Sequence, residues 1–365
     1  IDLAKTVEQC GEEDTEPFSY LDDAIPATKR SCYLTYTTAE TKQIVLDNKD
    51  LCPVYNGSIS GVGPRYCPSL ETKIVRFADK ERHQIFLEPE SEDTCEFYVQ
   101  GASTSMPSAV QEQIYRSIEG LENVDIMRDA YAIEYDCIDA TELNATLMSK
   151  KIGGLFFAGQ INGTSGYEEA AAQGLWAALN IALADKELPP FAPGREKAYM
   201  AVLTDDLVTR GTEEPYRMFT SRAEHRLCLR EDNADQRLTP LGREIGLVDD
   251  ARWNAFRRKR DRAGHFRQAL ESTRLDGEAA AAMQARDASW NAASLCGRTL
   301  AELLRRPDLD MAALARHVPA AAALLAEAGE TAGSVETDVK YAGYLERQRE
   351  LIRRAARLER TPLPD

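Results

Sequence analysis

The sequence lacks the features that carry a chain across or into a membrane. No uninterrupted apolar run approaches the roughly 20 residues that span a bilayer. Residues 1–17 contain no apolar core of a signal peptide, and an initiator methionine is missing. We therefore expect a cytoplasmic protein with no membrane partner, whose sequence begins inside a longer chain.

Closely spaced metal ligands are also missing. The eight cysteines stand at wide, irregular spacings without a CxxC pair, and His83, His225, His265 and His317 are far apart. Structural zinc sites need close pairs of such ligands, so we expect no metal. In a chain of this size without a signal peptide, the cysteines favour reduced thiols over disulfides.

Charge is distributed unevenly along the chain. Residues 1–200 contain 17 Lys and Arg against 33 Asp and Glu, whereas residues 201–365 contain 27 of each. The second part holds 25 Arg and two Lys, and guanidinium groups bind phosphate bidentately and stack on bases. The net charge of −16 therefore arises entirely in the first part, and it does not exclude nucleic acid binding.

Hydrophobic patterns predict an α/β first part. Strands are expected where apolar and β-branched residues alternate or run together, at 32–38, 83–89, 97–101, as two short strands about Asp129, and as a buried parallel strand at 153–160. Helices are expected where apolar residues recur every three or four positions, at 39–48, from 69 onward, at 107–120 and at 164–185.

The second part reads as helical. Three prolines within residues 188–194 mark a linker. Beyond it, residues 249–273 predict one amphipathic helix that begins with two aspartates, which suit the helix dipole. Residues 279–289 are Ala-rich and read as a helix or a connector. Residues 334–360 predict one long helix opened by a cap at Ser334.

A glycine-rich turn follows the apolar run at 153–160. Gly159, Gly163 and Gly166 would let a ligand approach the backbone, and the next helix would offer free N–H groups to a phosphate or to the pyrimidine edge of a flavin. The spacing differs from GxGxxG, so this is not the primary pyrophosphate loop. A tight turn that needs glycines only for packing is an equally good interpretation of the residues alone.

Residues 61–77 form a stiff segment with a cysteine at its centre. Arg65 near Cys67 would lower the pKa of the thiol and favour a nucleophile. Arg65, Lys73 and Arg76 would suit a nicotinamide cofactor or tRNA phosphate. Without further context, a buried and inert Cys67 is the more common outcome.

Two further segments concentrate arginine. The predicted helix contains Arg257, Arg258, Lys259 and Arg260, which suit an RNA backbone, although a solvated helix face would look the same. In residues 205–235, the arginines would bind phosphate or pair with nearby glutamates at a joint between domains. Spacing does not separate these interpretations for Arg217, Arg222 and Arg226.

Four long strings in this order resemble one family. They are RYCPS with IVRFADKERHQIFLEPE, AGQINGTSGYEEAAAQGLWA, DDLVTRGTEEPYRMFTSRAEHRLCLREDNADQRLT and VKYAGYLERQ. They are similar to the large flavoprotein subunit of the tRNA uridine 5-carboxymethylaminomethyl modification enzyme, the MnmG/GidA family. The resemblance covers nearly the whole chain, and chance agreement over four long strings is implausible.

The resemblance implies an enzyme that binds FAD and oxidises NADH. With a GTPase partner and methylene-tetrahydrofolate as carbon donor, it would add an aminomethyl or carboxymethylaminomethyl group to C5 of the tRNA wobble uridine. The resemblance also implies a homodimer. Cys67 would be catalytic, as a nucleophile or a base during uracil activation.

The resemblance extends to binding residues. The expected nicotinamide-cofactor positions are Gly63, Pro64, Arg65, Tyr66, Ser69, Lys73, Arg76 and Phe77. The expected FAD positions are Gly159, Gln160, Asn162, Gly163, Thr164, Gly166 and Tyr167. The expected tRNA contacts are Arg217, Arg222, Arg257, Arg258, Lys259 and Arg260.

The implied fold is α/β and α, with pieces of a glutathione-reductase-like FAD/NAD domain followed by a mostly helical region. We expect an inserted α/β region at 1–145, a returning segment of the FAD domain at 146–195, and an Arg-rich region for tRNA or partner at 196–365. Relative to the family, the sequence lacks the GxGxxG half and the last helical domain, and it has Ser165 and His225 where Thr and Tyr are usual.

Two alternatives remain open at this point. One is a non-catalytic fragment that only binds tRNA or a partner, because half of the expected flavin site is missing. The other is a folate- and FAD-dependent tRNA uridine methyltransferase, which by resemblance lacks the helical extension at 200–360.

Overall fold

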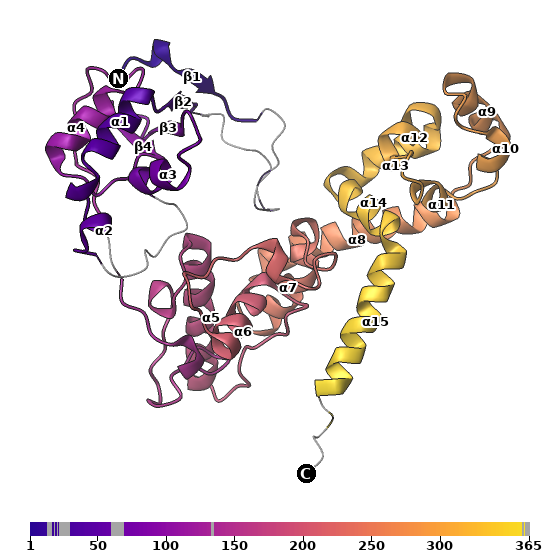
Figure 1. The fold of residues 1–365 in the computed structure, drawn as a ribbon. Helices are drawn as coiled ribbons and strands as arrows, with labels where there is room; N and C mark the ends of the chain where they lie inside the picture. Colours follow the sequence, from indigo (N-terminus) through magenta and orange to yellow (C-terminus); the bar gives the residue numbers. More distant parts are fainter. Residues whose placement is uncertain are drawn as a thin grey trace. The chain divides into compact units, whose positions relative to one another are not determined.

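The computed structural model describes residues 1–12, 17, 19, 21, 30–59, 69–132, 135–359 and 361. The chain divides into two compact units (Figure 1). One unit comprises Ile1–Phe191 and Leu203–Met218, and the other comprises Ala192–Val202 and Phe219–Asp365. The α/β first part followed by a helical region agrees with the expected fold class.

The first unit opens with a four-stranded antiparallel sheet in the order β1-β2-β3-β4. Its strands are β1 Val7–Gln9, β2 Cys32–Tyr36, β3 Gln84–Pro89 and β4 Phe97–Gln100. Ile85 and Leu87 alternate along β3 and are fully buried, as a strand with one covered face requires. The strands predicted near 32–38, 83–89 and 97–101 are confirmed.

Short helices accompany this sheet. They are η1 Leu3–Lys5, α1 Ala39–Asp47, η2 Lys49–Leu51, α2 Pro53–Asn56, α3 Leu70–Arg76 and α4 Ser108–Arg116. Helix α1 begins at Thr38, which forms a capping box with Thr41. Val45, Ile74 and Ile114 bring α1, α3 and α4 together in one apolar core.

Three predicted strands, the two about Asp129 and the one at 153–160, are absent from the described residues. The segment about Asp129 contains no strand in its described part, 124–132 and 135–136. Residues 153–160 form only an isolated bridge between Met148 and Phe156, and Leu155 is exposed. A parallel strand is stable only between neighbouring strands that satisfy its backbone, and the described chain places none beside this run.

Two longer helices follow in the chain. The elements after the sheet are η3 Ala140–Glu142, η4 Gln160–Asn162, α5 Tyr167–Asp185 and α6 Tyr199–Arg210. Helix α5 lies in the first unit, and α6 belongs to that unit from Leu203 onward. Trp176 of α5 is buried and packs edge-on against Phe191. Asn180 donates to the Phe191 carbonyl and accepts from the Phe191 N–H, so the proline-rich linker is tied to α5.

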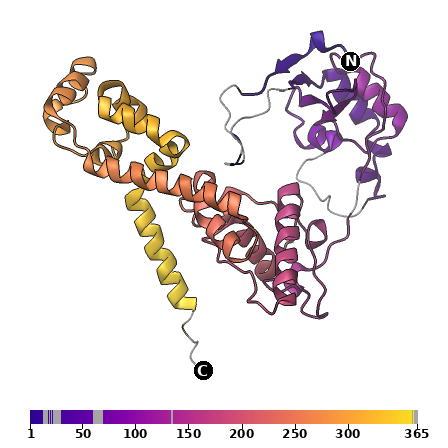
Figure 2. The ribbon, with the colours of Figure 1, turned by 180° about the vertical axis from the view of Figure 1, so that it is seen from behind.

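The second unit consists of helices. They are η5 Thr220–Arg222, η6 Glu231–Asn233, α7 Ala234–Glu244, α8 Asp250–Ser272, α9 Gly277–Arg286, α10 Ala292–Leu295, α11 Leu300–Leu304, α12 Met311–His317, α13 Pro319–Ala328, η7 Gly329–Thr331, α14 Ala332–Lys340 and α15 Ala342–Glu359. Phe266 and Leu270 of α8 enter a core with Leu303 and Val335. Figure 2 shows α15 leaving this bundle.

The helix predicted at 334–360 is wrong in one respect, because the chain breaks at Tyr341 into α14 and α15. Tyr341 has φ −95° and ψ 10°, outside helical geometry, and Gly343 follows, which weakens helix continuity. Ser334 lies inside α14 rather than at its start, and its hydroxyl donates to the Thr331 carbonyl. Tertiary packing of Val335 and Val339 ends α14 where the local pattern would continue it.

No helix in the described part of the chain is both long and apolar enough to cross a membrane. Among the same residues, no three His, Cys, Asp or Glu side chains gather so that they could hold a metal ion.

Candidate cofactor site and nucleic-acid interface

The glycine-rich turn between residues 157 and 167 has a backbone that only glycine adopts readily. Gly159 has φ 88° and ψ −146°, a region essentially closed to L side chains. Gly163 has φ 79°, and a Cβ there would lie 2.6 Å from Thr212 Oγ1. Thr164 forms a parallel bridge with Tyr216, which fixes the turn against the segment after α6.

A fully buried glutamine holds this turn to α5. Gln173 Oε1 accepts from Gly159 N–H at 3.2 Å and from Asn162 Nδ2 at 2.8 Å. Its Nε2 donates to Thr164 Oγ1 at 3.0 Å and to the Glu169 carbonyl at 3.1 Å. The amide group thus has a partner on both oxygen and nitrogen, as a buried polar side chain requires.

The sequence interpretation missed Gln173, although a signal was present. A glutamine within the Ala- and Leu-rich stretch of a helix is out of place unless it meets buried polar groups. The expected FAD positions Gly159, Asn162 and Thr164 are brought together by this one side chain.

Two buried oxygens beside the turn have no donor among the described residues, Asn162 Oδ1 and Glu169 Oε2. The other carboxylate oxygen of Glu169 accepts from Met218 N–H at 2.7 Å. A Cβ on Gly166 would lie 1.7 Å from Glu169 Oε2, so glycine is required for the carboxylate to lie there. A buried acceptor without a donor is costly, which makes this the place where a ligand with N–H or O–H groups would fit.

The remaining expected FAD positions lie at the edge of the turn. Gln160 is half-buried in η4, and Tyr167, the first residue of α5, is 78% exposed. Gly166 is the N-cap of α5 and has no side chain, so the first N–H groups of α5 lack a side-chain cap. These N–H groups and the helix dipole would favour an anion or a carbonyl oxygen.

The expected nicotinamide segment is described only in part. Cys67 and the positions Gly63, Pro64, Arg65 and Tyr66 lie outside the described residues. Ser69 is the N-cap of α3, where its hydroxyl accepts from Thr72 N–H.

The other expected nicotinamide positions are spread along α3. Lys73 donates to the Gly101 carbonyl at 2.9 Å, whereas Arg76 and Phe77 are exposed at the end of the helix. The last turn of α3 is therefore a basic and aromatic surface.

A buried carboxylate lies in the first turn of α3. Glu71 is fully buried, and its Oε1 accepts from the Ser105 N–H, the Ser105 hydroxyl and the Cys52 thiol. Burial raises the pKa of the Cys52 thiol, with the nearby Glu71 adding to the effect. Cys52 is therefore held as a neutral thiol and has no reactive character.

The structure separates the residues expected to contact tRNA. In α8, Lys259 forms an ion pair with Asp235 at 2.9 Å and Arg260 pairs with its neighbour Asp261. Arg257 and Arg258 are exposed and have no ion pair within the described chain. Arg217 and Arg222 belong to different units, and both have interaction partners.

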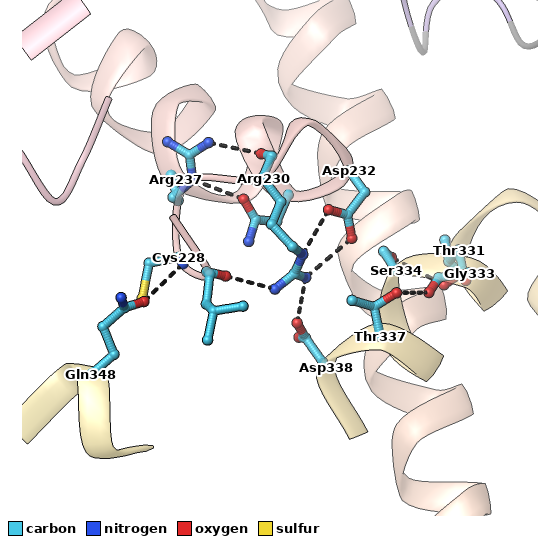
Figure 3. A network of polar contacts seen from close by, with 12 residues as sticks. Cys228, Arg230, Asp232, Arg237, Thr331, Gly333, Ser334, Thr337, Asp338 and Gln348 are labelled. Carbon is cyan, nitrogen blue, oxygen red and sulfur yellow. Dashed lines mark hydrogen bonds and ion pairs between the residues drawn. The ribbon is translucent and has the colours of Figure 1, made fainter. Parts of the chain in front are cut away.

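Other arginines of the second unit hold the fold together (Figure 3). Arg230 donates to both carboxylate oxygens of Asp232, at 2.8 and 3.1 Å, and to Asp338 at 2.6 Å. Arg267 binds the second oxygen of Asp338 at 2.6 Å. Arg237 donates to the Arg230 carbonyl at 2.9 Å, and burial lowers the pKa of its guanidinium.

A further arginine, Arg195, holds the segment 219–229 in place. Arg195 forms a two-pronged ion pair with Glu224, at 2.8 and 3.0 Å, and the hydrogen bonds of this pair lower the pKa of the Glu224 carboxyl. Gln348 of α15 donates to the Glu224 carbonyl and accepts from Cys228 N–H. Arg195 and Arg230 therefore pair with acidic groups inside the second unit.

Comparisons with known protein families give the same family in both parts of the chain. Residues 1–189 match the family described as glucose inhibited division protein A. Residues 250–349 match the family described as the tRNA modifying enzyme MnmG/GidA C-terminal helical domain.

Two solved structures of GidA from Aquifex aeolicus are similar over the whole chain. The form II crystal is 38% identical with a TM-score of 0.80, and the form I crystal is 38% identical with a TM-score of 0.76. Each comparison covers 100% of this chain, but only 57% and 58% of the Aquifex chain. The sequence therefore spans less than two thirds of the length of these relatives.

Proposed function

The chain belongs to the MnmG/GidA family of tRNA-modifying enzymes, and from that premise we propose that it is the middle and helical part of a flavoenzyme that modifies C5 of the tRNA wobble uridine. The observation that carries the proposal is the glycine-rich turn locked to α5, with two buried acceptors, Asn162 Oδ1 and Glu169 Oε2, that have no donor in the described part of the chain.

The residues at this turn fit a flavin. The isoalloxazine ring has an N–H donor beside its carbonyl groups, and the ribityl chain has hydroxyl donors, which would meet the two acceptors. The N–H groups at the start of α5 would meet a carbonyl oxygen. Gly159, Gln160, Asn162, Gly163, Thr164, Gly166 and Tyr167 would hold the group. When bound, FAD would supply the redox chemistry that takes hydride from NADH.

Helix α5 supports the same assignment. Most of its residues are Ala, Leu and other apolar types, and Leu175 and Ile181 are 43% and 49% exposed. A mostly apolar helix normally buries such side chains against another part of the protein. We propose that this face packs against the remainder of the flavin-binding domain, outside the residues of this chain; the matched part of the Aquifex chain is 57% of its length.

Cys67 would act on the uracil ring. Attack of its thiolate on C6 would form an S–C6 bond and move the electron pair to the C4 carbonyl, which makes C5 nucleophilic. C5 would then attack the methylene carbon delivered by methylene-tetrahydrofolate. Loss of the C5 proton and of tetrahydrofolate would leave an exocyclic methylene group on C5. The amine of ammonia or glycine would add to this methylene carbon, and loss of the thiolate from C6 would restore the ring with the aminomethyl or carboxymethylaminomethyl group on C5. NADH at Ser69, Lys73, Arg76 and Phe77, a GTPase partner and a homodimer complete the proposal.

The first test is the visible absorbance spectrum of the purified chain after incubation with excess FAD and desalting. A retained flavin band, absent for a Gly163→Val variant but present for Gly174→Ala, would support cofactor binding at the turn. Gly163 has no room for a side chain, whereas Gly174 faces open space. No band in the wild-type chain would favour the alternative, a non-catalytic fragment whose activity is limited to tRNA or partner binding.

The second test concerns RNA binding by α8. Arg257→Gln/Arg258→Gln should weaken tRNA binding and make its salt dependence shallower, because each phosphate contact to a single strand contributes a slope of about 0.7. Lys259→Gln is the comparison, since Lys259 is held by Asp235 and its loss should reduce stability rather than the salt slope. An unchanged slope in the double variant would count against this interface.

A further inference from the structure

An open groove lies between α1 and the loop that joins α3 to β3, outside the sites described above. It has a volume of about 650 Å³ and is lined by Thr37, Thr38, Ala39, Lys42, Gln43, Leu46, Glu81 and Arg82. Hydrogen bonds between His83 N–H and Thr37 Oγ1 and between Thr37 N–H and the His83 carbonyl hold its two sides together.

The cations at this groove are fixed but keep free donors. Lys42 Nζ donates to the Ala78 carbonyl, which leaves two of its three N–H groups unused. The Arg82 guanidinium stacks on the Tyr36 ring, 3.9 Å from the centroid, so the edges that bind phosphate stay open. Lys80 is exposed and follows Phe77, whose carbonyl accepts from Lys80 N–H.

The surroundings of the groove carry a small positive excess in a strongly acidic part of the chain. Residues 73–83 hold Lys73, Arg76, Lys80 and Arg82 against Asp79 and Glu81, and α1 adds Lys42 against Glu40 and Asp47. Burial, followed by Lys73, Lys42 and Lys80, lowers the pKa of His83. Because the other charges of residues 1–200 are mostly acidic, a polyanion would approach this part only where such cations gather.

We propose that this groove binds the phosphate backbone of RNA through Lys42 and Arg82, with the exposed Lys80 of the adjoining loop as a further phosphate contact. The proposal rests on the proposed tRNA substrate and adds a contact in the α/β part of the chain. A dinucleotide fits less well, because dinucleotide sites enclose the ligand at a Gly-rich turn, and the groove is open and its lining contains no glycine.

The groove also contains an acidic residue, and removing its charge should change the affinity for RNA in the opposite direction. Glu81 lines the groove next to Arg82, so it would repel a phosphate bound there. Glu81→Gln should therefore strengthen RNA binding, whereas Lys80→Gln and Arg82→Gln should weaken it.

The experiment measures binding of an unmodified tRNA transcript by fluorescence anisotropy over a series of salt concentrations. The slope of log K against log salt should become shallower by about 1.4 in Lys80→Gln/Arg82→Gln, from two lost contacts at about 0.7 each. Lys150→Gln/Lys151→Gln removes the same charge from exposed positions elsewhere in the unit and should leave the slope unchanged. Lys80→Gln alone alters only an exposed side chain and should make the slope of log K against log salt shallower by about 0.7.

Each outcome decides a separate point. A steep slope in the wild type that persists in the Lys80→Gln and double variants would overturn the groove while leaving the tRNA substrate in place. Equal losses in the Lys150→Gln/Lys151→Gln control would also overturn it, because only total charge would then matter. A wild-type chain without salt-dependent tRNA binding would overturn both the groove and the proposed substrate. Loss of NADH binding with unchanged RNA binding would assign the groove to the dinucleotide instead.

Discussion

Gly166→Ala tests whether the buried carboxylate of Glu169 positions the start of α5. The Gly166 backbone, with φ −115° and ψ 155°, suits any residue, so alanine brings no backbone strain. Its Cβ would however lie 1.7 Å from Glu169 Oε2, far inside contact distance. The carboxylate must therefore move, and its 2.7 Å hydrogen bond from Met218 N–H is lost.

The expected loss of stability in Gly166→Ala has two contributions. A hydrogen bond to a charged group contributes about 1.5–3 kcal/mol, and alanine is a poorer N-cap than glycine by roughly 0.5–1 kcal/mol. Gly166→Ala should therefore destabilise the start of α5 by about 2–4 kcal/mol. Gly174→Ala is the matched control in the same helix. No atom lies near its Cβ position, so it should stabilise α5 by about 1 kcal/mol.

Hydrogen exchange of the α5 amides, measured by mass spectrometry, reports the local free energy of opening. In a Glu169→Ala background, Gly166→Ala should cost only the N-cap difference of roughly 0.5–1 kcal/mol. Wild-type protection in Gly166→Ala would refute the reasoning. A cost that persists in full without Glu169 would show that the carboxylate is not the cause.

Three further predictions concern an acidic residue of the second unit, a buried tyrosine and Cys67. Asp338→Ala removes the acceptor shared by Arg230 and Arg267 and should lower stability by about 2–3 kcal/mol in thermal unfolding. Asp308→Ala breaks an exposed ion pair with Arg306 and should lower stability by less than about 1 kcal/mol. Equal losses of stability in the two variants would refute this reasoning. Burial raises the pKa of Tyr115 to about 12, so the folded chain gains stability below the unfolded pKa of about 10 and loses it as pH rises toward 12. The phenolate signal at 295 nm that Tyr115→Phe removes should appear near pH 12, and its appearance near pH 10 in the folded chain would contradict this. Cys67→Ser, in a longer chain that includes the rest of the flavin-binding domain, should abolish formation of the modified nucleoside but leave flavin binding intact. A normal yield of the modified nucleoside by mass spectrometry would refute the catalytic role of Cys67.

Local patterns predicted the elements whose stability is mostly local. The strands of the sheet, α1, α5 and α8 follow from alternation, capping residues and helical periodicity. The strand at 153–160 could not be judged in the same way, because a strand depends on partners that the pattern does not contain. The break at Tyr341 likewise depends on where Val335 and Val339 pack.

The candidate site was predictable in kind but not in arrangement. Gly159 and Gly163 were identified from spacing, and both have the positive φ that makes glycine necessary. The role of Gln173 and the two acceptors without donors depend on side-chain contacts across the turn. The partners of Arg230 are a similar case, since Asp338 lies 108 residues away in sequence.

The arginine-rich half shows why residue counts do not locate a nucleic-acid surface. Its 27 cations and 27 acids do not distinguish Arg230, which has acceptors from Asp232 and Asp338, from Arg257 and Arg258, which are exposed without an ion pair in the described part of the chain. A guanidinium that already holds two carboxylates would lose those bonds before it could bind phosphate, so its removal reduces stability first. An exposed guanidinium without a protein acceptor exchanges only water and counterions, so its removal changes the salt slope first. The proposed groove would make the same point in reverse, because Lys80 and Arg82 stand in a locally basic stretch, residues 73–83, of an acidic first part.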